Sequence, residues 1–98
     1  MKQTNREKDA FRLDLHGAYL RGTNLSRANL EAANLSGADF TGASFRGSNF
    51  RNANLAGTIL RGADLTDATN LTGEQLKAAI IDEQTRLPVL VPEPVSAK

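Results

Sequence analysis

The sequence predicts an all-β solenoid of short coils followed by a C-terminal helix, and three regularities support this fold class. A Leu or Phe stands at every fifth residue from position 15 to position 65. A small residue stands two positions before each of them except the first, often with Asn or Asp between the two, and Gly commonly follows two positions later. The core residues expected from this pattern are Leu15, Leu20, Leu25, Leu30, Leu35, Phe40, Phe45, Phe50, Leu55, Leu60 and Leu65.

A period of five fits neither a continuous helix nor a continuous strand. Five helical residues turn by about 500°, so the large side chains would form no stripe. In a strand, residues five apart point to opposite faces of the sheet. Each unit is therefore interpreted as a short extended piece followed by a turn, for which Gly and Asn are suited. Successive coils would then pair backbone to backbone at a spacing of about 4.8 Å.

The run Ala-Asn/Asp-Leu/Phe-x-Gly resembles the pentapeptide-repeat family over about residues 13–68, in eleven consecutive units. The resemblance implies a right-handed quadrilateral β-helix with four units in each coil. Residues 20 apart would then stack, and a solenoid over 13–71 would contain about three coils. Phe40, Phe45 and Phe50 would lie together in the middle coil, where core filling is the favoured interpretation over a ligand pocket.

The C-terminal end of the solenoid carries a predicted capping segment over 72–83. The register breaks by one residue near Asn70, and Thr72 and Gln75 then have the spacing of a capping box. We expect a helix over about 73–82 that lies across the last coil, an ending that resembles the one common after bacterial pentapeptide repeats. Its apolar face would carry Leu76, Ala79, Ile80 and Ile81.

Two interpretations stay open for each of the remaining segments. The N-terminal segment 1–12 carries a net charge of +2. Phe11 and Leu13 are expected either to form a small cap or to leave an open apolar end for end-to-end association. The tail over 84–98 contains three prolines, which exclude a helix. It is interpreted either as an extended arm that docks on the solenoid or on a partner, or as a disordered terminus.

Composition excludes most catalytic and charged-surface functions. The chain has 98 residues, a net charge of +1, no Cys and a single histidine, His16, which should point outward from a turn. No catalytic triad, carboxylate pair, phosphate loop or cluster of metal ligands is visible, so we predict no enzyme activity, no cofactor and no metal. Positive and negative charges are dispersed and balance within residues 13–68, which also predicts no direct binding to nucleic acid. No apolar stretch approaches a membrane span and no signal peptide is visible, so we expect a cytoplasmic protein without membrane insertion.

A non-catalytic protein-binding or scaffold module is the leading functional hypothesis. The alternative is a structural or assembly subunit of a larger complex, anchored through its termini. A third hypothesis comes from the family: some members mimic B-form DNA and bind DNA gyrase, but they resemble long acidic rods, which this chain does not. We expect a protein partner and either a monomer or an end-to-end dimer. The candidate partner-binding residues are Tyr19, Ile59, Arg21, Arg61, Val89, Leu90 and Val91, and the outward Arg46 and Arg51 are further residues to test.

Overall fold

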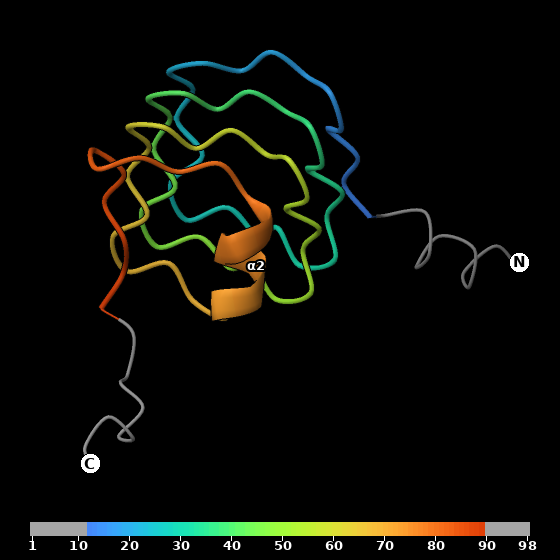
Figure 1. Cartoon of the computed structure of the whole chain (residues 1–98). Helices are drawn as coiled ribbons and strands as arrows, with labels where there is room; N and C mark the ends of the chain where they lie inside the picture. The colour runs from blue at the N-terminus through green and yellow to red at the C-terminus, as the bar shows by residue number, and fades with distance from the viewer. Residues whose placement is uncertain (1–11, 90–98) are drawn as a thin grey trace, which may run out of the picture.

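The chain winds into a four-sided coil (Figure 1). The structure is a computed structural model, and it describes residues 12–89. Within this range no extended piece is long enough to form a named strand, and neighbouring coils are joined by ten isolated parallel β-bridges. The bridges fall into four ladders, one on each side of the solenoid. They are Asp14–Asn34–Asn54, Tyr19–Asp39–Ile59–Ile80, Asn24–Ser44–Asp64–Arg86 and Asn29–Asn49–Thr69. The structure therefore has the four units per coil that the 20-residue stacking requires.

Each β-bridge consists of two backbone hydrogen bonds that join one coil to the next. On the second side, the N–H of Asp39 donates to the Ala18 carbonyl, and the N–H of Leu20 donates to the Asp39 carbonyl, each at 2.8 Å. Both polar backbone groups of Asp39 thus point toward the preceding coil. The same pattern recurs on every side, so the Asn/Asp position of each unit holds the ladder while the next residue points inward.

A residue with positive φ closes each of the regular turns between two sides from residue 17 to residue 67. Seven of these positions are glycines, for example Gly42 with φ of 72°. Four other turns hold a side chain in the same left-handed conformation, namely Arg27, Ala32, Asn52 and Asp67. The Asn or Asp of the unit assists by accepting a bond from the backbone two residues later, as Asn24 does from Ser26 at 3.0 Å.

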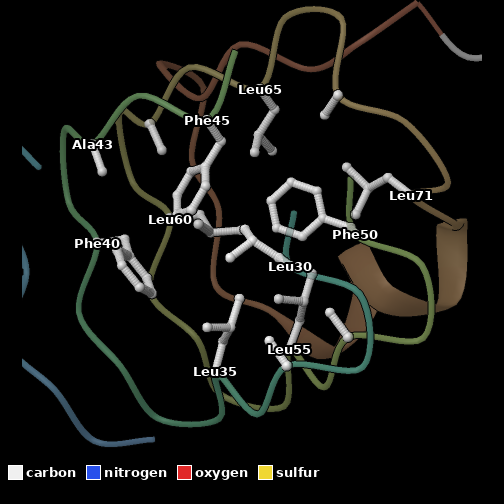
Figure 2. Packing of buried hydrophobic residues seen from close by; sticks show 14 of the residues in the cluster. Leu30, Leu35, Phe40, Ala43, Phe45, Phe50, Leu55, Leu60, Leu65 and Leu71 are labelled. Atoms are coloured by element: carbon white, nitrogen blue, oxygen red, sulfur yellow. The ribbon is translucent and has the colours of Figure 1, made fainter. Parts of the chain in front are cut away.

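The interior is a single column of leucine, phenylalanine and alanine side chains (Figure 2). Eight of the eleven expected core residues, from Leu30 to Leu65, are at most 2% exposed. The rings of Phe40 and Phe45 meet edge to face with centroids 4.9 Å apart, and those of Phe45 and Phe50 lie 5.3 Å apart. The three phenylalanines therefore fill the middle coil as core residues and do not line a ligand pocket. Leu15, Leu20 and Leu25 of the first coil are only partly buried.

Helix α2 spans Gly73–Ala78 and begins at the predicted capping box. The Gln75 N–H donates to Thr72 Oγ1 at 3.1 Å, and the Thr72 N–H donates to Gln75 Oε1 at 2.7 Å. The expected helix end near residue 82 is wrong, because Ala79 has extended backbone and Ile80 returns to the ladder opposite Ile59.

The apolar face expected for this helix is only partly confirmed. Leu76 and Ala79 pack against the core, as the spacing indicates. Ile80 and Ile81 lie beyond the helix and remain 38% and 37% exposed. The cause is the same backbone pairing that ends α2: once Ile80 joins the second-side ladder, its side chain points outward like that of Ile59.

The solenoid also continues into the segment that the sequence predicts as a tail. Arg86 pairs with Asp64 on the third side, and Pro88 is buried. Of the two interpretations of the segment from residue 84, the extended arm that docks on the solenoid therefore agrees with Arg86 and Pro88, and a disordered terminus is wrong for these two residues. The next side chain, Val89, is 95% exposed. Residues 1–11 and 90–98, with Phe11, Leu90 and Val91, lie outside the described residues.

Candidate protein-docking face

The second side of the solenoid carries two of the predicted partner-binding residues in one ladder. Tyr19 lies two coils from Ile59, with Asp39 between them, and Ile80 follows Ile59 in the same ladder. Tyr19 is 72% exposed and Ile80 is 38% exposed, while Ile59 is half-buried. This placement confirms that Tyr19 and Ile59 share one side. Ile80 is an addition that sequence reasoning missed because it assigned that residue to the helix.

The predicted arginines Arg21 and Arg61 stand in a second row on the same side. The row is fixed by the turns, since the Gly22 N–H donates to the Thr41 carbonyl at 2.8 Å and the Gly42 N–H donates to the Arg61 carbonyl at 2.9 Å. Four residues that the sequence predicts as partner-binding candidates therefore lie on one side of the solenoid, with two of them in the first coil and two in the third. We define the second face as Tyr19, Arg21, Ile59, Arg61 and Ile80.

Arg21 is held in place by two neighbours. Its guanidinium lies 5.2 Å from the centroid of the Tyr19 ring, and its Nε donates to Asp39 Oδ2 at 2.9 Å. The first contact is a cation–π interaction and the second a charge-assisted hydrogen bond. Arg21 therefore neutralises the carboxylate in the middle of the face, and the apolar ladder is not interrupted by a free charge.

Asp39 is stabilised in its ionised form mainly by its own turn. The Thr41 hydroxyl donates to Asp39 Oδ1 at 2.6 Å and the Thr41 N–H donates to the same atom at 3.0 Å. These bonds, together with the Arg21 guanidinium, lower the pKa of Asp39 to about 2. The carboxylate is thus a fixed negative charge at neutral pH, with all its partners supplied by the chain.

The remaining candidate arginines project from other sides, as the repeat predicts. Arg46 Nη1 donates to Asp64 Oδ2 at 3.2 Å, and the pKa of Asp64 is lowered first by the Thr66 hydroxyl and then further by Arg46. Arg46 and Arg51 each line an open hollow, of ≈ 380 Å³ and ≈ 470 Å³. Neither Arg46 nor Arg51 lies on the second face.

Within the part of the chain that the structure describes, no group of side chains is arranged for catalysis or for metal binding. His16 is exposed in its turn and its Nδ1 lies 2.7 Å from Asp14 Oδ1, with no nucleophile beside them in any described hydrogen bond. No group of three or more His, Cys, Asp or Glu side chains within residues 12–89 could hold a metal ion. In the same range, no helix has both the length and the apolar character needed to cross a membrane.

Known proteins of similar sequence and structure contain the same repeat. A family model described as "Pentapeptide repeats" matches residues 12–52 and 33–80, with eight copies of the repeat. A pentapeptide repeat protein from the cyanobacterium Cyanothece 51142 is 36% identical, with a TM-score of 0.67 over 78% of this chain and 51% of the other. One from Nostoc Pcc 7120 is 26% identical over 99% of this chain and 92% of the other, with a TM-score of 0.35. This chain thus spans about half the length of the Cyanothece protein. No curated protein matches it.

Proposed function

This chain belongs to the pentapeptide repeat family, whose members form right-handed quadrilateral β-helices, and we propose that it is a non-catalytic protein-binding or scaffold module. The observation that supports this function best is the second face. There an exposed tyrosine and two isoleucines lie in one ladder, beside a row that contains two arginines. The repeat normally places Asn or Asp at these ladder positions, so the apolar side chains are not needed for the fold.

The chemistry of the face indicates what kind of partner it accepts. Tyr19 and Ile80 offer apolar surface, and such exposed side chains gain free energy when a partner covers them. Arg21 already has a carboxylate partner in Asp39, whereas Arg61 forms no ion pair with any residue in 12–89. The matching partner is a protein segment with apolar side chains next to a carboxylate, which would pair with Arg61.

The same electrostatics argues against the DNA-mimic alternative. A mimic of DNA needs a continuous negative surface. Asp39 is paired with Arg21 and Asp64 with Arg46, and the whole chain has a net charge of +1. For this reason we do not propose that the chain modulates DNA gyrase.

Anchoring through the C-terminal tail is a second candidate function, favoured by one observation. Val89 is 95% exposed and Leu87 is 45% exposed, so two aliphatic side chains project beyond the last ladder residue, Arg86. A structural or assembly subunit could be held in its complex by this segment together with Leu90 and Val91.

Affinity capture from native lysate, with variants on matched sides, tests both functions. Ile59→Lys with Arg61→Glu alters the second face, and Ala56→Lys adds a charge to the first side of the same coil as a control. A protein retained by the wild type and by Ala56→Lys, but lost with the double variant, would support the second face. Loss only on truncation after residue 86 would favour the tail. Equal retention by all four chains, each with an unchanged Tm, would reject both sites.

A further inference from the structure

We propose that the hollow beside Arg51 and Asn52 binds a small organic carboxylate, whose charge pairs with the arginine and whose apolar part packs against Leu71. The hollow lies at the corner between the fourth and first sides of the solenoid. It is therefore separate from the second face, and it does not depend on the proposed function. Its evidence is a backbone hydrogen bond that the other turns form and this turn lacks.

The backbone N–H of Asn52 has no partner within residues 12–89. From Gly17 to Gly62, every other turn residue with positive φ donates its N–H to the chain segment one coil later. At the same corner one coil earlier, the Ala32 N–H donates to the Arg51 carbonyl at 2.8 Å. Asn52 has φ of 58° like the others, so its N–H points toward a place where an acceptor is expected.

The break in register at the end of the third coil removes this acceptor. One coil earlier, the acceptor is the carbonyl of the residue after the inward Phe50, and its equivalent here is Thr72, the residue after the inward Leu71. The Thr72 carbonyl accepts from the Leu76 N–H at 3.1 Å instead, because Thr72 is the N-cap of α2. The helix thus uses the carbonyl that a regular coil would offer to Asn52.

A hollow of ≈ 470 Å³ lies beside this N–H, and its volume is within the range of small-molecule sites. The residues that line it are Arg51, Asn52, Ala53, Asn70, Leu71, Thr72 and Gln75. Thr72 and Gln75 are bonded to each other, and the Gln75 amide also donates to two carbonyls, so these two residues form walls. Leu71, which packs into the core (Figure 2), and Ala53 add apolar surface.

Arg51 supplies the positive charge of the hollow. Its side chain is exposed and forms no ion pair with any residue in 12–89. Glu31 precedes it by one coil at the same corner but does not line the hollow, and no other acidic residue of the described chain lines it either. A guanidinium next to an unpaired N–H favours an anion, because oxygen atoms of one anionic group can accept from both donors.

The lining favours a carboxylate over a phosphate as the anionic group. Two donors, the Arg51 guanidinium and the Asn52 N–H, match the two oxygens of a carboxylate. A phosphate group has more oxygens and more charge, and the hollow contains no second cation to balance it. Leu71 and Ala53 provide a surface against which an apolar part of the ligand gains free energy on leaving water.

Titration of the isotope-labelled full chain with hexanoate, followed by NMR, tests the proposal. We expect saturable shifts of the Asn52 and Leu71 amides, with the Asn52 amide proton moving downfield as it donates to the carboxylate. The Kd should lie in the millimolar range, since one ion pair and a small apolar contact form. Acetate has the charge without the apolar part and should bind more weakly. Hexylamine has the opposite charge and should not bind in the hollow.

Two arginine variants separate the site from a general effect of charge. Arg51→Gln removes the cation of the hollow and should weaken hexanoate binding about tenfold or more. Arg27→Gln is the matched control, because Arg27 is also exposed, forms no ion pair in residues 12–89 and lies at another corner. It should leave the affinity for hexanoate unchanged. Equal Tm values of both variants and the wild type would exclude a folding defect.

Three results would overturn the proposal. The first is the absence of saturable shifts at the Asn52 amide, or equal shifts with hexylamine, because the hollow would then not select a carboxylate. The second is an equal loss of affinity in Arg51→Gln and Arg27→Gln, which would assign the binding to the net charge of the chain. The third is tighter binding of inorganic phosphate than of hexanoate, which would contradict a ligand with one carboxylate and an apolar part.

Discussion

The two ends of the solenoid differ in how the last coil is closed, although both are built from the same repeat. On the second side, Leu20 in the first coil is half-buried whereas Leu60 in the third is 0% exposed. On the third side, Leu25 and Leu65 differ in the same way. The repeat unit therefore does not decide whether a coil is buried. At the C-terminal end, the segment that follows the solenoid buries the third coil.

Side chains replace the missing coil at the C-terminal end. Gln75 Nε2 donates to the Phe50 and Ala53 carbonyls at 2.8 Å and 3.0 Å, and Thr85 Oγ1 donates to the Leu60 carbonyl at 2.8 Å. Asp82 Oδ1 accepts from the Gly62 N–H at 3.1 Å. The bonds to the Ala53 carbonyl and the Gly62 N–H replace bonds that a further regular coil would have formed, because the equivalent groups of Ala33 and Gly42 pair with the coil after them. Within residues 12–89, the N-terminal end has no such set of bonds.

The largest expected difference between the ends appears when the stacked leucines are truncated. Leu60→Ala should lower the free energy of unfolding by about 2–5 kcal/mol, because the side chain is fully buried and leaves a cavity. Leu20→Ala, on the same side, should cost about 1–2 kcal/mol, since part of that side chain is already in water. Urea denaturation of both variants measures the two values. Equal costs would contradict the difference between the ends.

Loss of the Gln75 side chain should have the next largest effect. Gln75→Ala removes two bonds to the carbonyls of Phe50 and Ala53 in the second coil and half of the capping box, so we expect a loss of about 1–3 kcal/mol. Gln84→Ala is the matched control, because only the backbone N–H of Gln84 forms a bond, to Asp82. Thermal unfolding of the two variants should separate them clearly. Similar Tm values would show that Gln75 does not close this end.

The turns of the first and second coils allow a smaller, opposite pair of changes. Ala32 holds φ of 61°, so Ala32→Gly should raise the free energy of unfolding by up to about 1 kcal/mol. Gly42→Ala should lower it by about 1 kcal/mol, because a Cβ there meets no atom within 4 Å and only the backbone conformation is penalised. Chemical denaturation measures the sign of the change in the free energy of unfolding for each variant. An increase for Gly42→Ala would show that the left-handed backbone of this turn does not strain a residue with a Cβ.

The smallest expected effect is the acid dependence of Asp39. Its pKa of about 2 lies below the ordinary value of 3.8, so ionised Asp39 favours the folded chain. That contribution is complete above about pH 4 and is lost as the pH falls toward 2. Asp39→Asn keeps an oxygen for the Thr41 N–H, as other repeats do, but removes the titration. The variant should therefore lose less stability than the wild type between pH 4 and 2. An unchanged slope would exclude Asp39 as a source of the acid dependence.

The candidate face was predictable in part because its residues fall within the regular repeat. Tyr19 and Ile59 are 40 residues apart, and the 20-residue coil places them on one side without any knowledge of coordinates. Ile80 was missed because it lies 21 residues after Ile59, beyond the break in register. Residues 20 apart no longer stack on the same side once the spacing between coils changes. The spacing of the apolar residues in 76–80 also fits a helix, so the sequence alone favoured the helix there.

The sequence by itself determined the inward leucines and phenylalanines and the start of α2 at Thr72, and the four-sided coil was implied by its resemblance to the pentapeptide-repeat family. These features depend on neighbouring residues and on a strict period, and both can be recognised directly in a repetitive sequence. Only the tertiary structure decided where α2 ends, that Ile80 and Arg86 rejoin the ladders, and that Gln75, Asp82 and Thr85 close the last coil. Those outcomes depend on which backbone groups the third coil leaves unpaired, and an unpaired group becomes visible only when the coils are placed in space.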